Sequence, residues 1–179
     1  MIYYSDYLEL DKVLSAQHPE SDKAGQPAHD EMLFIITHQT FELWFKQVLF
    51  EMRSVIALFH RDYVPEADVF LALSRLRRTN RIMEHLAEQF TLIETMTPGD
   101  FMEFRAFLNP ASGFQSVQWR VLERTLGLRE ERRVLRAYTD ALAEQHRAEL
   151  DAATAGTTLF DAIAVSYTHL RAHETGRNL

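Results

Sequence analysis

The sequence contains no cysteine among its 179 residues. The absence of thiols excludes disulfides, thiolate zinc sites, iron–sulfur clusters, a cysteine nucleophile and a thiolate axial ligand for a haem. A chain without cysteine fits a reducing compartment, and we therefore expect a cytoplasmic protein.

Glycine and proline are also scarce, with six and five residues, and they fall between long periodic segments. No two glycines lie close enough to form a phosphate-cradling loop. No apolar run approaches the ~18 residues of a membrane span, and the first residues lack the basic start and apolar stretch of a signal peptide. These features predict an all-α protein with short connections and no membrane segment.

Positive charge is in deficit, because Lys and Arg number 19 against 26 Asp and Glu, for a formal net charge of −7. Phosphate contacts need Lys and Arg, so nucleic acid and anionic membranes are not expected partners. One helix carries a cluster of arginines, which we interpret as a solvated face. The cluster comprises Arg75, Arg77, Arg78 and Arg81.

Apolar periodicity predicts a series of helices separated by turn residues. The expected helical ranges are 3–17, 30–60, 66–93, 100–108, 114–126 and 129–150, with a further helix beginning at 157–164. We expect a loop over 17–28. Asp30 and Asp100 are predicted N-caps, and Gly127 is a predicted C-terminal glycine.

The segment 30–60 is the most informative, because its apolar residues recur at steps of three and four and form one stripe of a helix. The stripe comprises Phe34, His38, Phe41, Phe45, Val48, Met52, Val55 and Phe59. The predicted core face of the helix 66–93 comprises Val69, Leu73, Leu76, Met83, Ala87 and Phe90.

Two polar residues among aromatics are open to two interpretations. His38 can be a hydrogen-bonded core residue, or its imidazole can serve a flat heteroaromatic ligand beside Phe34, one turn earlier. Arg105, which lies among Phe101, Phe104 and Phe107 in the sequence, can stack on the rings. If it is buried, it needs an anionic partner such as a ligand carboxylate.

His169 and His173 have the i, i+4 spacing that places two imidazoles on one helix face. Two ligands are too few for a zinc site, so we expect no metal role for this pair. A helical metal protein built on these histidines is the least favoured interpretation of the chain.

Three long motifs follow one another in the first two thirds of the chain. They are YSDYLELDK at 4–12, HDEMLFIITHQTFELWFK at 29–46, and FMEFR at 101–105 with PASGFQS at 110–116. Together they resemble the tryptophan 2,3-dioxygenase family, in order and in spacing, and the resemblance extends over about residues 3–163.

The resemblance implies a helical bundle of the haem-dependent indole dioxygenase type, incomplete at its C-terminus. It also implies haem b as cofactor, with L-tryptophan and O2 as substrates. The family cleaves the indole C2–C3 bond to give N-formylkynurenine, the first step of tryptophan catabolism through the kynurenine pathway.

Roles for individual residues follow from the same resemblance. His38 matches the histidine that hydrogen-bonds the indole N–H and is the expected catalytic residue. Phe34 and Phe101 match residues that pack against the indole ring. Arg105 matches the arginine that pairs with the substrate carboxylate.

Four further positions match residues at the edge of the family's site. Ser112 and Gly113 match the loop beside haem and substrate. Tyr4 and Tyr7 match residues that reach into a neighbouring subunit's pocket, so the resemblance implies a homotetramer.

The chain departs from the family in two respects. The family's proximal histidine lies beyond residue 179, so we expect no iron ligand here, little activity of the isolated chain, and an uncovered apolar face on the helix 30–60. The resemblance also ends at about Ala164. We therefore expect a family domain over 1–164 and a non-native tail over 165–179, which resembles translated sequencing-adaptor sequence. The alternative, from another class, is a non-catalytic helical oligomerisation module.

Overall fold

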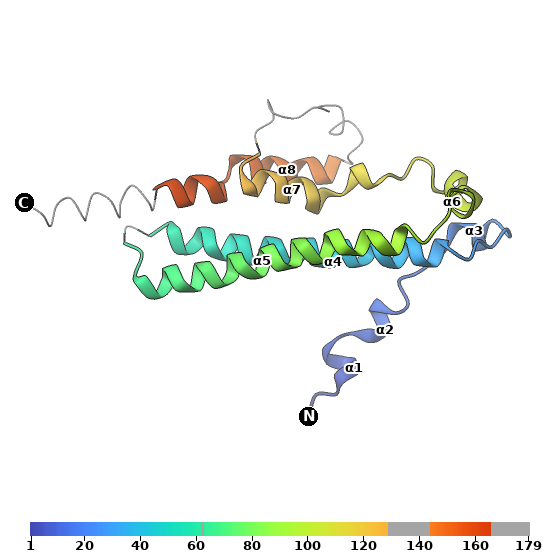
Figure 1. The fold of residues 1–179 in the computed structure, drawn as a ribbon, viewed down its shortest axis with the longest axis horizontal. Helices are drawn as coiled ribbons and strands as arrows, with labels where there is room; N and C mark the ends of the chain where they lie inside the picture. Colours follow the sequence, from blue (N-terminus) through green and yellow to red (C-terminus); the bar gives the residue numbers. More distant parts are fainter. Residues whose placement is uncertain (62, 129–143, 166–179) are drawn as a thin grey trace, which may run out of the picture. The chain divides into compact units, whose positions relative to one another are not determined.

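A computed structural model of the chain describes residues 1–61, 63–128 and 144–165, and within these ranges all regular structure is helical. This confirms the all-α prediction (Figure 1). The α-helices are α1 (Tyr4–Tyr7), α2 (Leu10–Val13), α3 (Glu20–Lys23), α4 (Glu31–Phe59), α5 (Glu66–Ile93), α6 (Pro98–Arg105), α7 (Val117–Leu126) and α8 (Glu144–Ala155). Two 3₁₀ turns, η1 (Ala106–Leu108) and η2 (Gly113–Gln115), follow α6, and residues 159–165 are also helical.

The chain divides into two compact units. The first unit comprises Met1–Phe41 and Glu88–Ser112, and the second unit comprises Glu42–Ala87 and the chain from Gly113 onward. The helices α4 and α5 each contribute one part to each unit, and the two units are described separately below.

Aromatic contacts join the helices of the first unit. Phe104 of α6 is fully buried. The rings of Phe41 on α4 and Phe90 on α5 lie 5.3 Å apart, and the Thr40 hydroxyl donates to the Gln89 side chain at 3.1 Å. These contacts join the first turns of α4 to the last turns of α5 inside this unit.

The core of the second unit is built on the predicted stripe of α4. Val48, Met52 and Val55 are each 0% exposed, and Phe45 lies 5.2 Å, ring to ring, from Trp119 of α7. The helices α7 and α8 also pack against each other in this unit. The predicted stripe is therefore the buried face of α4 here.

The predicted core face of α5 is wrong. Its buried residues are Ala72, Thr79, Ile82 and Leu86. Leu73 and Phe90, which we expected to be buried, are 42% and 58% exposed. Since α5 has apolar residues on more than one side, periodicity fixes the helix but leaves the choice of buried face to its packing partners.

The N-terminal region also differs from the prediction. Residues 3–17 form two separate turns, α1 and α2, because Glu9 adopts a left-handed conformation with φ 50°. Nearly all side chains of this segment are exposed, and isolated helices shorter than ~12–15 residues are marginal without packing. The expected loop 17–28 contains α3, which the sequence analysis missed.

The cap of α6 is Thr97, not Asp100. The Thr97 hydroxyl accepts the Asp100 N–H at 3.2 Å, and the Asp100 carboxylate accepts the Thr97 N–H at 2.9 Å, with Pro98 in the first turn. This is a reciprocal capping box, in which each side chain satisfies an N–H at the helix start.

The next helix starts later than expected, because Ser116 caps α7 by accepting the Trp119 N–H at 3.2 Å. Gly127 ends α7 at φ 100°, as predicted for a left-handed C-terminal glycine. Residues 129–143, most of the expected helix 129–150, lie outside the described residues, as do 166–179 of the expected tail.

The arginine cluster on α5 is largely a solvated face, as predicted, and one of its members also pairs with a buried carboxylate. Arg78 Nη1 lies 2.6 Å from Oε1 of Glu51, a carboxylate that is 2% exposed. The Gln47 side-chain amide donates to the same oxygen at 2.7 Å. A buried carboxylate is costly unless it is paired, so Arg78 and Gln47 account for the burial of Glu51.

Several apolar side chains of α4 remain exposed, in agreement with the expected uncovered face. Ile36, Leu43 and Phe50, spaced by seven residues, are all exposed in the structure. Within the described ranges, no helix combines the length and the apolar character that crossing a membrane requires.

Candidate functional site

The candidate site in the first unit is built on three phenylalanines from two helices. Phe34 belongs to α4, and its ring lies 5.8 Å from that of Phe101 and 5.5 Å from that of Phe104, both on α6. Phe101 and Phe104 meet edge to face at 5.4 Å. These centroid distances are typical of favourable aromatic pairs, so the three rings form one apolar cluster.

His38 adds a hydrogen-bonding group to this cluster. Its ring lies 4.1 Å from that of Phe34 and meets Phe41 edge-on at 6.2 Å. Nδ1 of His38 lies 2.7 Å from the Phe34 carbonyl oxygen. A carbonyl only accepts, so Nδ1 donates in this contact, and Nε2 of the neutral ring is left as an acceptor.

Local sequence explains this arrangement. Phe34 and His38 are four residues apart on α4, and Phe101 and Phe104 are three apart on α6, so each pair shares one helix face. The capping box fixes where α6 begins. Hydrogen bonds from the Thr97 hydroxyl and then its N–H lower the pKa of Asp100 against a small opposing effect of burial, so the capping carboxylate is ionised at neutral pH.

Arg105 is the last residue of α6 and is half-buried. Its Nη1 donates to the Ala111 carbonyl oxygen at 3.4 Å, which is long for such a bond. A guanidinium held this loosely can turn toward a carboxylate and bind it through two parallel N–H donors.

The loop after Arg105 carries the next predicted residues. It contains a cis peptide between Asn109 and Pro110, and Ser112 and Gly113 follow it. Both are exposed. Ser112 belongs to the first unit and Gly113 opens the second.

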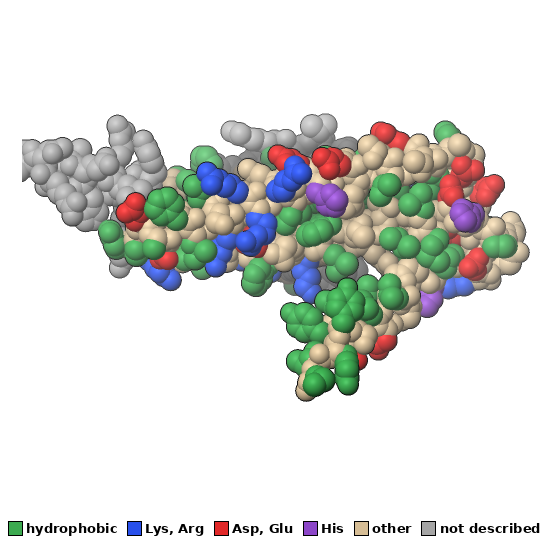
Figure 2. All heavy atoms as spheres, turned by 60° about the horizontal axis from the view of Figure 1, so that its bottom comes forward, with side chains coloured by type: hydrophobic (Ala, Val, Ile, Leu, Met, Phe, Trp, Pro, Cys, Tyr) green, Lys and Arg blue, Asp and Glu red, His purple; other side chains and the backbone are tan. Residues whose placement is uncertain are grey.

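Tyr4 and Tyr7 are not part of the aromatic cluster. Both belong to α1 and are 76% and 75% exposed. Figure 2 shows hydrophobic side chains gathered on this N-terminal segment. The exposed apolar residues there are Met1, Ile2, Tyr3, Tyr4, Tyr7, Leu8, Val13 and Leu14.

Sequence reasoning missed two residues of this region. Phe104 was noted beside Arg105 but not assigned to the site, although its spacing of three from Phe101 was the signal that could have found it. Glu31, the first residue of α4, is 0% exposed, and its position in the sequence gives no local signal of this burial. Within the part of the chain that the structure describes, His, Asp and Glu side chains form no cluster of three suited to a metal ion.

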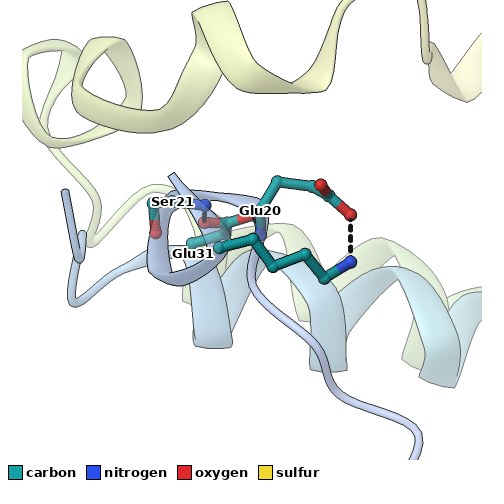
Figure 3. A network of polar contacts seen from close by, with 4 residues as sticks. Glu20, Ser21 and Glu31 are labelled. Carbon is teal, nitrogen blue, oxygen red and sulfur yellow. Dashed lines mark hydrogen bonds and ion pairs between the residues drawn. The ribbon is translucent and has the colours of Figure 1, made fainter. Parts of the chain in front are cut away.

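Glu31 is held by donors from the turn before it (Figure 3). Its carboxylate accepts the backbone N–H of Glu20 at 2.8 Å and of Ser21 at 2.9 Å. Burial alone would raise its pKa, but hydrogen bonds from the Ser21 hydroxyl and these two N–H groups, with the charge of Lys23, lower the pKa below its ordinary value. The carboxylate is therefore charged at neutral pH.

Comparison with known proteins identifies the family to which the chain is similar. The family model described as tryptophan 2,3-dioxygenase matches residues 1–176. This match extends over most of 165–179, and the boundary at residue 164 stays a prediction.

Curated relatives carry the same description. The tryptophan 2,3-dioxygenase of Bdellovibrio bacteriovorus is 54% identical over 128 residues, covering 72% of this chain and 36% of the relative. That of Aedes aegypti is 53% identical over 131 residues, 73% of this chain and 33% of the relative. That of Alteromonas mediterranea is 44% identical over 164 residues, 90% of this chain and 45% of the relative. The matched part of the chain thus spans between a third and a half of the length of these relatives.

Proposed function

The chain belongs to the tryptophan 2,3-dioxygenase family, and we propose that it forms part of an enzyme that cleaves the indole C2–C3 bond of L-tryptophan. Both atoms of O2 enter the product, N-formylkynurenine, in the first step of tryptophan catabolism through the kynurenine pathway. We also propose a cytoplasmic location, which a chain without cysteine fits.

The main structural support for this proposal is the acceptor nitrogen of His38. Because Nδ1 of His38 is engaged by the Phe34 carbonyl, its Nε2 is left as an acceptor among aromatic rings. The indole of tryptophan is a flat aromatic group with a single N–H donor. A single acceptor beside an aromatic cluster is the complement of that group.

The other side chains of the cluster would orient the substrate. Phe34 and Phe101 would pack against the indole ring and exclude water from it, and His38 would fix its rotation by accepting the indole N–H. Arg105, at the end of α6, would bind the carboxylate. Holding the ring and the carboxylate together fixes the orientation of C2 and C3 of the indole. This positioning is the main catalytic contribution available to these residues.

The family's haem fits the residues present only in part. The acceptor nitrogen and aromatic rings of the first unit suit the substrate side of a haem, and the Ser112–Gly113 segment would lie beside it. Bound haem iron would supply the activation of O2. We propose no axial ligand among the described residues and assign His38 to the substrate.

The test is a comparison of two proteins. The first is the 179-residue chain, and the second joins residues 1–164 to the C-terminal remainder of the Bdellovibrio bacteriovorus relative. With haem supplied, we expect the chimaera to form N-formylkynurenine and the chain by itself to form little or none. Robust turnover by the 179 residues would show that they ligate iron, and an inactive but folded, haem-loaded chimaera would contradict the proposed activity.

The alternative of a non-catalytic helical oligomerisation module rests on the exposed apolar residues of the N-terminal segment. Calorimetric titration with L-tryptophan distinguishes it from the enzyme, because an oligomerisation module has no reason to bind the amino acid.

We propose a homotetramer as the assembly of the full-length protein. Its support is the exposure of Tyr4 and Tyr7, since large exposed apolar groups mark interaction surfaces. In the chimaera, replacing both tyrosines by serine should shift the mass measured by sedimentation toward smaller species. An unchanged tetramer would remove α1 from the interface.

A further inference from the structure

Glu31 has a buried charge that the proposed chemistry does not use. Its two carboxylate oxygens each accept a different backbone N–H, one from Glu20 and one from Ser21. The Ser21 hydroxyl in turn accepts the Ala28 N–H at 3.1 Å. A buried carboxylate is costly unless such donors satisfy it. The segment 19–28 therefore supplies the donors that stabilise the Glu31 charge, and Glu31 supplies the acceptors for those N–H groups.

This network joins α3 to the start of α4 (Figure 3). Glu20 and Ser21 are the first two residues of α3, whose leading N–H groups have no partner within the helix. The Glu31 side chain supplies the missing acceptors. Lys23 is occupied by an ion pair with Glu20, so the direct contacts of Glu31 are hydrogen bonds to α3.

The helix α3 also contacts η1. The turn η1 begins directly after Arg105 and leads to Ala111, whose carbonyl oxygen accepts the Arg105 hydrogen bond. A connection therefore runs from Glu31 on α4, through α3, to the segment that follows Arg105. All of it lies in the first unit, and it is separate from the ring contacts between Phe34 and α6.

We propose that Glu31 is a positioning residue, which acts through α3 and η1 to set Arg105 relative to Phe34 and His38. The aromatic contacts tie α6 to α4 at Phe101 and Phe104. The Glu31 connection supports the end of α6, where the guanidinium must meet a carboxylate while the indole lies on the rings. The consequence for ligand binding rests on the proposed function, whereas the structural connection does not.

The main variant is Glu31→Gln. The amide keeps one acceptor oxygen but turns an NH₂ group toward a backbone N–H, so one of the two hydrogen bonds is lost. The matched control is Glu94→Gln, which removes an exposed charge at the end of α5 in the same unit. Hydrogen exchange followed by mass spectrometry should show faster exchange at 104–112 in Glu31→Gln, as well as at 19–28, and no change in the control.

A milder pair of variants covers the case in which Glu31→Gln fails to fold. Glu20→Pro removes only one N–H donor to Glu31, at a first helical position that accepts proline. Glu20→Ala keeps that N–H and loses the same ion pair with Lys23. Faster exchange at 104–112 in Glu20→Pro, but not in Glu20→Ala, supports the connection. Faster exchange confined to 19–28 in every variant overturns it.

Ligand binding by the same proteins separates the inference from the proposed function. L-Tryptophan and tryptamine share the indole, but tryptamine lacks the carboxylate. We expect Glu31→Gln to weaken L-tryptophan binding roughly tenfold and to leave tryptamine binding unchanged, because only the Arg105 contact is misplaced. An equal loss for both ligands would reduce Glu31 to a merely structural residue. If the unmutated chain binds neither ligand, the proposed function fails, and hydrogen exchange still decides the inference.

Discussion

His38 donates its Nδ1 hydrogen to the carbonyl of Phe34 at 2.7 Å, while the two rings lie 4.1 Å apart. One helical turn therefore fixes both the tautomer of the neutral imidazole and its place against an aromatic face. Because Nδ1 is engaged in this contact, Nε2 is the nitrogen that can accept a hydrogen bond from a ligand.

The first prediction concerns the indole N–H. If Nε2 of His38 accepts it, the chain should bind L-tryptophan more tightly than 1-methyl-L-tryptophan, which has no such hydrogen, by roughly 3- to 10-fold. His38→Ala should abolish this preference, as measured by calorimetric titration. His29→Ala, an exposed histidine before α4, is the control. A preference that survives in His38→Ala would assign the acceptor to another group.

The second prediction concerns the carboxylate of the substrate. Arg105→Lys keeps the charge but loses the planar, two-donor geometry. Binding of L-tryptophan should weaken roughly 10- to 100-fold, as expected for a charge-assisted hydrogen bond. Tryptamine binding should not change. The control is Arg53→Lys, an exposed arginine of α4 in the second unit. Equal losses for both ligands in Arg105→Lys would contradict the assignment.

The third prediction is a pH dependence of stability. The folded-state pKa of Glu31 lies below its ordinary value of 4.5, so its contribution is fully present above that value. It is lost as the pH falls below 4.5 and through the lowered pKa, because protonation then favours the unfolded chain. The facing groups are the hydroxyl and N–H of Ser21, the N–H of Glu20 and the charge of Lys23.

Urea unfolding between about pH 6 and pH 3 measures this contribution. The free energy of unfolding should fall less steeply with decreasing pH in Glu31→Gln than in the unmutated chain, because one linked proton is removed. Parallel pH profiles for the two proteins would mean that Glu31 has the same pKa folded and unfolded.

The fourth prediction tests the buried stripe of α4. Met52 is 0% exposed and Phe50, two residues away, is 67% exposed. Met52→Ala should lower the free energy of unfolding by about 2–5 kcal/mol, because it leaves a cavity. Phe50→Ala should change it by less than about 0.5 kcal/mol. Similar losses for the two variants, measured by urea unfolding, would mean that Phe50 is covered in solution.

Local signals in the sequence determined the long helices, the end of α7 and the family motifs of this protein. The bounds of α4 and α5 were predicted to within a residue or two, because periodicity and the breaks at Pro65 and Pro98 are local signals. The left-handed end of α7 at Gly127 is equally local. The motifs that carry the resemblance are contiguous stretches, so they too could be read before any fold was known.

Tertiary structure decided the rest. Periodicity showed that α5 is a helix, but its packing partners select which of its faces is buried. Ala72 and Ile82 are therefore buried, whereas Phe90 is exposed. The burial of Glu31 depends on N–H groups ten and eleven residues away, and the meeting of Phe34 with Phe101 joins residues far apart in the chain. A helix forms from interactions within a few residues, whereas burial and charge compensation depend on which segments meet in space. For that reason only the folded chain shows them.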